Sequence, residues 1–183
     1  MITVLPARAF REGRWLNGMG VSWDIAAEPA GAGVTGFDWR FAIARIDADV
    51  PFSRYDGIDR VFTLLAGDGL TLDLAGQPSI IVREPHVPYA FPGDVKTVCR
   101  LQGGPCRALN LFLARGTWSA EVAVHGGAGE VPDGGTSLLF ALAGDVRVGD
   151  SVLCEGDAAV ATGGFAFEAG QGRLYVARLS HIA

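Results

Sequence analysis

The sequence predicts an all-β protein built of two small β-barrels in tandem, and three observations support this fold class. Segments rich in Val, Leu, Ile and Phe are short, and glycine-containing turns separate them, with 26 glycines in 183 residues. Apolar residues alternate with other residues along these segments, which is the period of a strand, and helical periodicity is nearly absent. A motif of the first half also recurs in the second half.

Individual segments follow this pattern closely. In WRFAIARI, residues 39–46, one face of the predicted strand carries Trp39, Phe41 and Ile43, and the other carries Arg40, Ala42 and Ala44. The segment RVFTLLAGDGLTLDL, residues 60–74, predicts two strands of a hairpin around a Gly-Asp-Gly turn at 67–69. The segment RALNLFLAR, residues 107–115, predicts the strand that closes the first half.

The two halves resemble each other around one turn. TLLAGDGLTL, residues 63–72, is echoed by FALAGDVRV, residues 140–148, each with an apolar strand, Ala-Gly-Asp and a second strand. This echo predicts an internal duplication. The Gly-rich and Pro-containing segment at 125–135 is the expected crossover between the halves. We therefore expect a first barrel with an N-terminal segment over 1–118 and a second, shorter barrel over 119–183, packed as one globular unit.

The composition excludes several function classes. Fifteen Lys and Arg against 20 Asp and Glu give a formal charge of −5, so the chain has no basic surface for nucleic acid. No apolar run approaches the roughly 20 residues of a membrane span, and no secretory leader is recognisable, so we expect a soluble, cytoplasmic protein. The three cysteines lack CxxC spacing, which argues against a disulfide framework or zinc site and predicts reduced core thiols.

Six short motifs follow one another along the chain: RWLNGMG (14–20), FDWR (37–40), PFSRYDGIDR (51–60), LLAGDGL (64–70), FPGD (91–94) and GPCRALN (104–110). In this order they resemble the motifs of the HutD/Ves family of bacterial proteins associated with histidine utilisation. The chain departs from the family pattern at Met19, where the family commonly has Gly, at Ala42, where Ser is frequent, and at SWDI (22–25), which replaces a Thr/Arg-Glu-Ile stretch.

The resemblance implies a bicupin, which is two tandem barrels of the double-stranded β-helix type. It also implies a cytoplasmic and dimeric protein. Members of the family are proposed to bind N-formylglutamate or a related pathway intermediate and to modulate histidine degradation. The expected partner is therefore a small acidic metabolite.

The first barrel lacks the ligands of a metal-binding cupin, which typically places His-x-His and Glu before the glycine of its hairpin. Counting back from Gly67 puts Arg60 in the glutamate place. The histidine places fall on Ser53 and Tyr55 or on Arg54 and Asp56. A guanidinium repels a dication and no imidazole is present in this segment, so we expect neither a metal nor another cofactor in this barrel.

Arg60 is the central candidate for ligand binding. It begins an apolar strand and follows Asp59, and in the glutamate place its charge would point into the barrel. A guanidinium there would complement the carboxylate of a small molecule. The alternative is that Arg60 pairs with Asp59 or Asp56 at the rim and only shapes the loop.

Three candidates precede the first regular strand. Gly18 permits close backbone approach, and Asn17 can both donate and accept hydrogen bonds, which suits a loop that covers a pocket mouth. Trp15 is expected either to form a wall of the site or to anchor a turn in the core.

Three further candidates belong to the strand region. Asn110 interrupts an apolar strand, so its amide must line the pocket or satisfy a neighbouring backbone edge. Arg40 lies in the cavity or on the surface. Tyr55 is a polar group next to the expected ligand position.

The leading hypothesis is a binding protein that regulates or buffers histidine degradation, without catalytic residues. The runner-up is a metal-independent isomerase or hydrolase acting on a small carboxylate, with Tyr55, Asp56 or His86 as acid or base. The third hypothesis is a protein-interaction scaffold. A polar, enclosed pocket in the first barrel would favour the first two hypotheses, and a barrel filled by side chains would favour the third.

Overall fold

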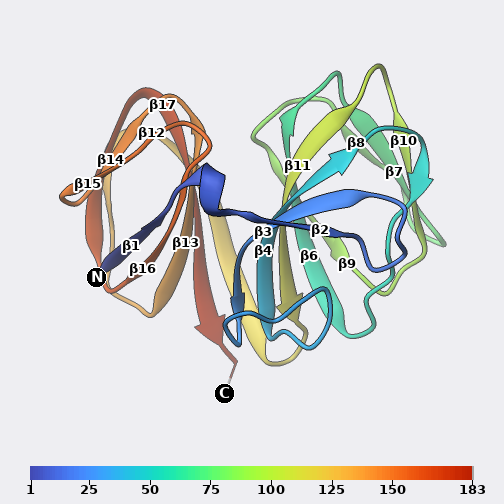
Figure 1. The fold of residues 1–183 in the computed structure, drawn as a ribbon, viewed down its shortest axis with the longest axis horizontal. Helices are drawn as coiled ribbons and strands as arrows, with labels where there is room; N and C mark the ends of the chain where they lie inside the picture. The colour runs from blue at the N-terminus through green and yellow to red at the C-terminus, as the bar shows by residue number, and fades with distance from the viewer. Residues whose placement is uncertain (183) are drawn as a thin grey trace. The chain divides into compact units, whose positions relative to one another are not determined.

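The computed structural model describes residues 1–182, which form β-strands and one three-residue 3-10 helix, η1 (Ala7–Ala9) (Figure 1). The all-β prediction is confirmed. The chain divides into two compact units. We call residues 11–117 the N-terminal barrel, and residues 1–10 together with the chain from Trp118 onward the C-terminal barrel. Within the described residues, no helix is long and apolar enough to cross a membrane.

The N-terminal barrel consists of two antiparallel sheets. Its strands are β2 (Arg11–Arg14), β3 (Val21–Glu28), β4 (Trp39–Ile46), β5 (Val50–Pro51), β6 (Ile58–Ala66), β7 (Leu70–Leu74), β8 (Ile80–Val82), β9 (Pro88–Pro92), β10 (Thr97–Leu101) and β11 (Cys106–Ala114). The larger sheet has the order β2, β3, β4, β11, β6, β9, and the smaller sheet has the order β5, β10, β7, β8.

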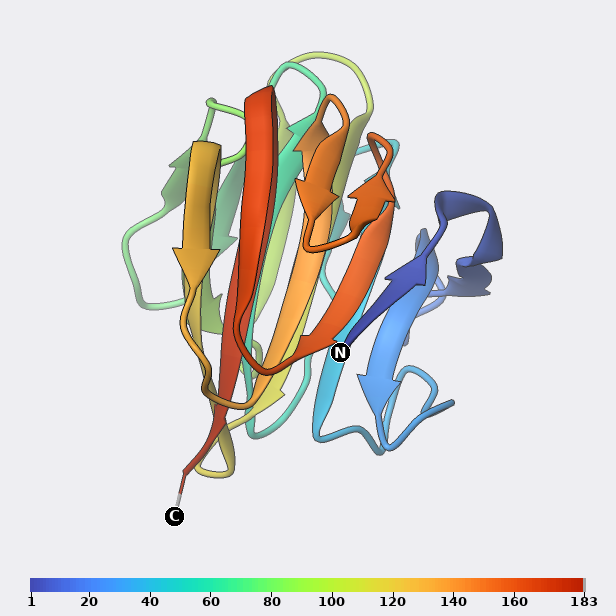
Figure 2. The same ribbon diagram turned by 90° about the vertical axis from the view of Figure 1, so that its left-hand side faces the viewer.

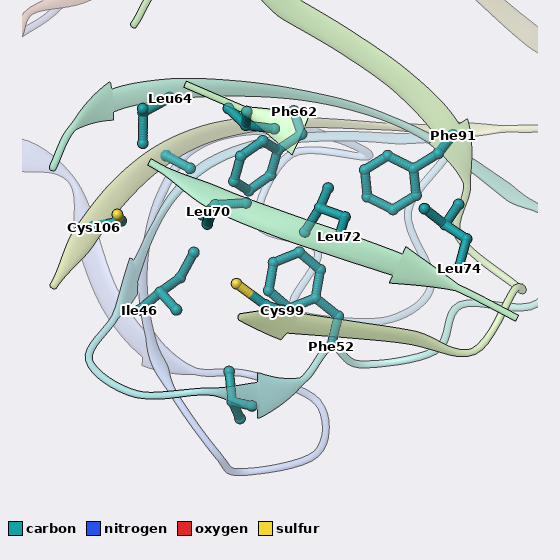
Figure 3. Close-up of a cluster of buried hydrophobic side chains, with 13 residues drawn as sticks. Ile46, Phe52, Phe62, Leu64, Leu70, Leu72, Leu74, Phe91, Cys99 and Cys106 are labelled. Carbon is teal, nitrogen blue, oxygen red and sulfur yellow. The ribbon is translucent and has the colours of Figure 1, made fainter. Parts of the chain in front are cut away.

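Strand alternation builds the apolar core of this barrel. In β7, Leu70, Leu72 and Leu74 are buried, whereas Thr71 and Asp73 between them are only half-buried. Figure 3 shows these leucines facing side chains from other strands of the barrel. Burying an aliphatic or aromatic side chain stabilises the fold by about 1.5 to 3 kcal/mol. The cluster comprises Ile46, Val50, Phe52, Phe62, Leu64, Leu70, Leu72, Leu74, Val82, Phe91, Cys99, Cys106 and Ala108.

The C-terminal barrel is formed by one sheet, in which β12 and β17 are much longer than the other strands. Its strands are β1 (Ile2–Leu5), β12 (Trp118–Val131), β13 (Thr136–Ala143), β14 (Val146–Val148), β15 (Ser151–Leu153), β16 (Ala158–Thr162) and β17 (Phe165–His181). The order is β1, β16, β13, β17, β14, β15, and β12 pairs with β17 from one end to the other (Figure 2). Apolar side chains fill its interior, among them Val131, Leu139, Val146, Leu153, Phe165, Phe167 and Leu174.

The two barrels share one topology. The order β4, β11, β6, β9 of the N-terminal barrel corresponds to β12, β17, β13, β16 of the C-terminal barrel. The order β5, β10, β7, β8 corresponds in turn to β12, β17, β14, β15. The long strand β12 therefore corresponds to both β4 and β5 of the N-terminal barrel, and β17 corresponds to both β11 and β10. This correspondence supports the predicted internal duplication.

The shared topology assigns counterparts to individual residues. Arg60 in β6 and Ser137 in β13 lie the same number of residues before their Ala-Gly-Asp turns. The residue two positions further on pairs with Asn110 of β11 in the N-terminal barrel and with Val176 of β17 in the C-terminal barrel. The polar pair Arg60 and Asn110 thus corresponds to Ser137 and Val176.

The hairpin predicted over residues 60–74 is wrong in its pairing. The two strands and their turn are present, but β6 pairs with β11 and β9, and β7 pairs with β10 and β8. The turn therefore carries the chain from the larger to the smaller sheet. Gly67 has φ +114°, and a Cβ there would lie 2.5 Å from Sγ of Cys106, so this close passage requires glycine.

The N-terminal segment and the crossover also differ from expectation. Residues 1–10, expected in the first barrel, lie in the C-terminal barrel, because β1 pairs with β16 and the Ala7 N–H donates to Asp157 at 2.8 Å. Most of the expected crossover at 125–135 belongs to β12. Its glycines mark an irregularity of that strand, since the register with β17 shifts at Gly127, where φ is +71°.

All three cysteines are free thiols. Cys99 and Cys106 are buried, as predicted, and burial raises the pKa of Cys99 to about 12. Cys154 is exposed, so the prediction of a core thiol is wrong there; it directly follows β15, at the start of a turn.

Candidate functional site

A small cavity with polar groups in a largely apolar wall lies in the N-terminal barrel. Its volume is about 30 Å³, which is room for one or two water molecules. Its walls come from β3, β4, β6 and β11 and from the segments around Trp15 and Phe52. The lining residues are Trp15, Ser22, Arg40, Ala42, Ile43, Ala44, Phe52, Ser53, Tyr55, Arg60, Asn110 and Phe112.

Strand register explains why two arginines face this cavity. Phe112 of β11 pairs with Arg40 of β4 on one side and with Arg60 of β6 on the other. Cross-strand partners lie on the same face of a sheet, and every second residue returns to that face. Asn110, two residues before Phe112, therefore lines the same cavity.

Arg60 is a buried cation, and no carboxylate among residues 1–182 pairs with it. Its exposed fraction is 6%, and Nη2 donates a hydrogen bond to Oδ1 of Asn110 at 2.7 Å. The guanidinium carbon lies 4.8, 5.1 and 4.8 Å from the ring centroids of Phe52, Phe91 and Phe112. Nε has no hydrogen-bond partner among the described residues. Burial lowers the pKa of Arg60 to about 10, so the group remains charged at neutral pH.

The alternative that Arg60 pairs with a neighbouring aspartate is wrong. Asp59 instead binds Arg115 at 2.7 Å, and Asp56 binds Arg54 at 2.9 Å. Arg60 therefore has no counterion within residues 1–182. Because an unpaired buried charge is costly, this position is destabilised unless an anion enters the cavity.

Arg40, by contrast, is fully paired. Its exposed fraction is 2%, and its Nε donates to Oδ1 of Asp24 at 2.7 Å. Nη2 donates both to the same carboxylate and to Oγ of Ser22, the latter at 3.2 Å. Arg40 thus lines the cavity, with its charge neutralised by Asp24.

Tyr55 brings a phenol to the cavity from an aromatic cluster. Its ring lies 5.1 Å from that of Phe112 and 6.0 Å from that of Phe37. Burial raises the pKa of Tyr55, although the charges of Arg40 and Arg60 act in the opposite direction. The phenol therefore keeps its proton at neutral pH and can donate a hydrogen bond to an anion.

Trp15 forms one wall of the cavity. Its Nε1 donates to the carbonyl of Val21 at 3.0 Å, and its ring meets that of Phe52 edge-on at 5.6 Å. Gly20 passes directly beside the indole, since a Cβ at Gly20 would lie 2.4 Å from Cε2 of Trp15. Both roles expected for Trp15 are present, because its side chain anchors a turn and also forms a wall of the cavity.

Asn17 and Gly18 do not line the cavity. The Asn17 N–H donates to Oγ of Ser53 at 3.2 Å, and its Nδ2 donates to the carbonyl of Pro51 at 2.9 Å. Asn17 thus fastens the loop that carries Trp15. Gly18 has φ +72° and serves the turn of that loop. We therefore place these two residues in a supporting role, because the backbone N–H and the Nδ2 of Asn17 each already donate to the protein.

The structure brings other residues to the site that the sequence analysis did not single out. Phe52 and Phe112 line the cavity, and Asp24 pairs with Arg40 behind it. Ser53, which the sequence placed at a histidine position of a metal-binding cupin, also lines the cavity. Phe112 could have been predicted as a lining residue, because it lies two positions after Asn110 in the same strand. The ion pair between Asp24 and Arg40 depends on the pairing of β3 with β4, which local sequence patterns do not reveal.

Of the three candidate acids or bases, Tyr55 alone reaches the cavity. Asp56 has an 82% exposed side chain and pairs with Arg54. His86 lies in the segment between β8 and β9 with φ +68°, and it is not a lining residue. Within residues 1–182, no group of three or more His, Cys, Asp or Glu side chains could hold a metal ion.

The chain is similar to several known bacterial proteins. It is 34% identical over 151 residues to an uncharacterized 21.2 kDa protein in the hutC 3′ region of Pseudomonas putida, covering 80% of this chain and 77% of that protein. It is 29% identical over 140 residues to protein Ves of Citrobacter koseri, covering 76% and 72%.

Solved structures agree with these relatives. HutD from Pseudomonas fluorescens SBW25, determined in a formate condition, has a TM-score of 0.88 at 30% identity, over 100% of both chains. Ylba from E. coli shares the fold alone, with a TM-score of 0.75 at 8% identity over 98% of this chain and 90% of its own. The HutD family model matches residues 7–176. The chain therefore belongs to the HutD family, with the bicupin fold that its sequence motifs predicted.

Proposed function

We propose that this protein binds a small carboxylate in the N-terminal barrel, with Arg60 as the counterion of the ligand. The observation that carries the proposal is the burial of Arg60 without a carboxylate partner among the described residues. A guanidinium forms forked hydrogen bonds with a carboxylate, and its Nε has no other partner here. An anion in the cavity would offset the cost of the buried charge.

The neighbouring groups suit the same ligand. Asn110 holds one nitrogen of Arg60 and so fixes the plane of the guanidinium. The phenol of Tyr55 is a donor for a carboxylate oxygen, and the rings of Phe52 and Phe112 exclude water from the contact. Electrostatic attraction is strongest where water is excluded.

The size of the cavity limits what enters it. About 30 Å³ accommodates a carboxylate group, while drug-sized ligands occupy pockets of roughly 300 Å³ or more. We infer that a larger acid such as N-formylglutamate places one carboxylate on Arg60 and requires the Trp15 loop to move. The similarity to HutD and to a protein in a hutC region supports a role in modulating histidine utilisation.

Binding accounts for the site better than turnover or scaffolding. The lining residues include no His, Cys, Asp, Glu or Lys, and burial raises the pKa of Tyr55, so its phenol stays protonated at neutral pH and cannot accept a proton. A scaffold does not require a polar cavity with a buried cation. The apolar interior of the C-terminal barrel shows that this fold can do without one.

Calorimetric titration with formate, and then with N-formylglutamate, tests the proposal. Arg60→Ala should weaken binding by about 2 to 5 kcal/mol, the range for truncating one member of a buried charged pair. Arg60→Lys should recover part of the loss, because an ammonium cannot make the planar two-pronged contact.

The matched control is Arg54→Gln, which removes an arginine from an exposed ion pair of the same barrel. It should bind as the wild type does. Circular dichroism melts verify that each variant is folded. Equal binding by folded Arg60→Ala and wild type would overturn the proposal.

A further inference from the structure

We propose that Asp24 sets the charge selectivity of the cavity, by neutralising Arg40 and leaving Arg60 as the one uncompensated cation. The site then selects a single carboxylate over a doubly charged anion of similar size. This inference rests on the proposed function and names the class of ligand group that the cavity takes.

Two guanidinium groups stand against the same cavity. The guanidinium carbon of Arg40 lies 5.3 Å from the ring centroid of Phe112, and that of Arg60 lies 4.8 Å from it. Both arginines line the cavity, and both pair in strand register with Phe112. An anion bound there therefore experiences the charge of both. Two uncompensated cations in the wall of one cavity would favour a dianion.

Asp24 neutralises the positive charge of Arg40. It comes from β3 and is not a lining residue, so its carboxylate lies behind Arg40. It accepts hydrogen bonds from both Nε and Nη2 of Arg40. The side chains are 16% and 3% exposed, so water screens the pair weakly. The pair of Asp24 and Arg40 has no net charge. The net charge of the site is therefore the single positive charge of Arg60.

A purely structural role of Asp24 would have a different consequence. If Asp24 only kept Arg40 buried, its removal would lower stability and weaken the binding of all anions alike. If it sets selectivity, its removal changes the ratio of affinities for mono- and dianions. The ratio therefore separates the two roles.

Formate and oxalate are the probes, because they carry one and two charges at neutral pH. Oxalate is also the larger of the two, so the readout is the change of their affinity ratio between variants. Calorimetry at constant ionic strength should show that the wild type prefers formate. Asp24→Asn should shift the ratio of the two affinities towards oxalate by roughly tenfold or more, since a second uncompensated cation then faces the ligand. The double variant Asp24→Asn/Arg40→Gln should restore the wild-type ratio, because it removes both charges of the pair.

The control is Arg11→Gln. Arg11 lies 3.7 Å from Asp24, but its side chain is 62% exposed and outside the cavity, so the ratio should not change. An unchanged ratio in folded Asp24→Asn overturns the inference. If that variant does not fold, Arg40→Gln replaces it: the unpaired Asp24 should then reduce formate affinity at least roughly tenfold, and the double variant should recover it. Formate binding by Arg40→Gln at the wild-type level would also overturn the inference.

Arg60→Gln separates this inference from the proposed function. If Arg60→Gln abolishes binding of both probes while Asp24→Asn leaves their ratio unchanged, the carboxylate site stands and only the role of Asp24 fails. If the wild type binds neither probe, or if Arg60→Gln binds both normally, the proposed function and this inference fail together.

Discussion

Nη2 of Arg60 donates a hydrogen bond to Oδ1 of Asn110 at 2.7 Å, so a neutral amide stands where a buried arginine would ordinarily meet a carboxylate. The two residues come from adjacent strands, β6 and β11, and both are almost completely buried. The amide satisfies one donor of the guanidinium and leaves its charge uncompensated. This pair makes the N-terminal barrel receptive to an anion.

A carboxylate introduced next to Arg60 should compete with the ligand and prevent formate from binding. In Asn110→Asp the new carboxylate pairs with Arg60, so we expect a formate affinity at least roughly tenfold lower and a free energy of unfolding higher by about 1 to 3 kcal/mol. Calorimetry and denaturant melts measure both quantities. Asn110→Leu is the control, since it removes the acceptor and should lower both. Unchanged formate binding by Asn110→Asp would contradict the placement of the ligand at Arg60.

The Trp15 wall can be displaced by a single methyl group. A Cβ at Gly20 would overlap the indole at 2.4 Å, so Gly20→Ala should push Trp15 off the cavity and weaken formate binding. Gly13→Ala is the matched control, because a Cβ at Gly13 meets nothing within 4 Å. Tryptophan fluorescence and calorimetry give the two readouts. The idea fails if both variants bind alike.

Binding should be independent of pH over the neutral range. Burial holds the pKa of Tyr55 above its usual 10 and leaves that of Arg60 at about 10, so neither group changes charge between roughly pH 6 and 9. Formate affinity measured across this range should be constant. A clear slope would indicate that another titrating group takes part.

Stability should depend on pH only in the alkaline range, as far as Tyr55 is concerned. A phenol whose pKa is higher in the folded state stabilises the fold fully below its unfolded pKa of 10, and this contribution is lost as pH rises through the folded pKa. Melting temperatures should therefore fall above about pH 10, and less steeply in Tyr55→Phe. An identical alkaline decline in both proteins would contradict this assignment.

The thiols should differ sharply in reactivity. Cys154 is exposed, whereas Cys99 and Cys106 are buried, and burial raises the pKa of both buried thiols. A thiol reagent should label one cysteine in the native protein and all three after unfolding. Cys154→Ser should remove the native labelling. Rapid native labelling of two or more thiols would contradict the core described above.

Sequence patterns were sufficient where the information is local. Alternation predicted the strands, and it made Arg40 and Asn110 candidates for the cavity while leaving a surface or backbone role open for them. Counting back from Gly67 made Arg60 the central candidate, beside the alternative of an ion pair at the rim, and all three line the cavity. The repeated Ala-Gly-Asp turn predicted the duplicated topology. In each case the relevant spacing lies within one or two neighbouring strands.

Features that depend on distant pairing were not predictable. The Asp24 and Arg40 pair requires the register of β3 against β4, which shifts at an irregularity between Asp24 and Ala26. Asn17 points to Pro51 and Ser53, more than thirty positions along the chain, so its local sequence suggested a ligand role instead. The place of residues 1–10 likewise depends on pairing with β16 near the opposite end of the chain.

The correspondence of Arg60 and Asn110 with Ser137 and Val176 has an evolutionary consequence. After a duplication, selection for a ligand needs to act on one copy alone, and the other is free to accumulate residues that favour folding. The C-terminal barrel then preserves a working solution for the same strands without a buried arginine and its amide partner at these positions. Replacing Arg60 by serine and Asn110 by valine would give the N-terminal barrel the residues that the C-terminal barrel has at these positions. The second barrel thus supplies the substitutions for a variant that folds but does not bind the carboxylate.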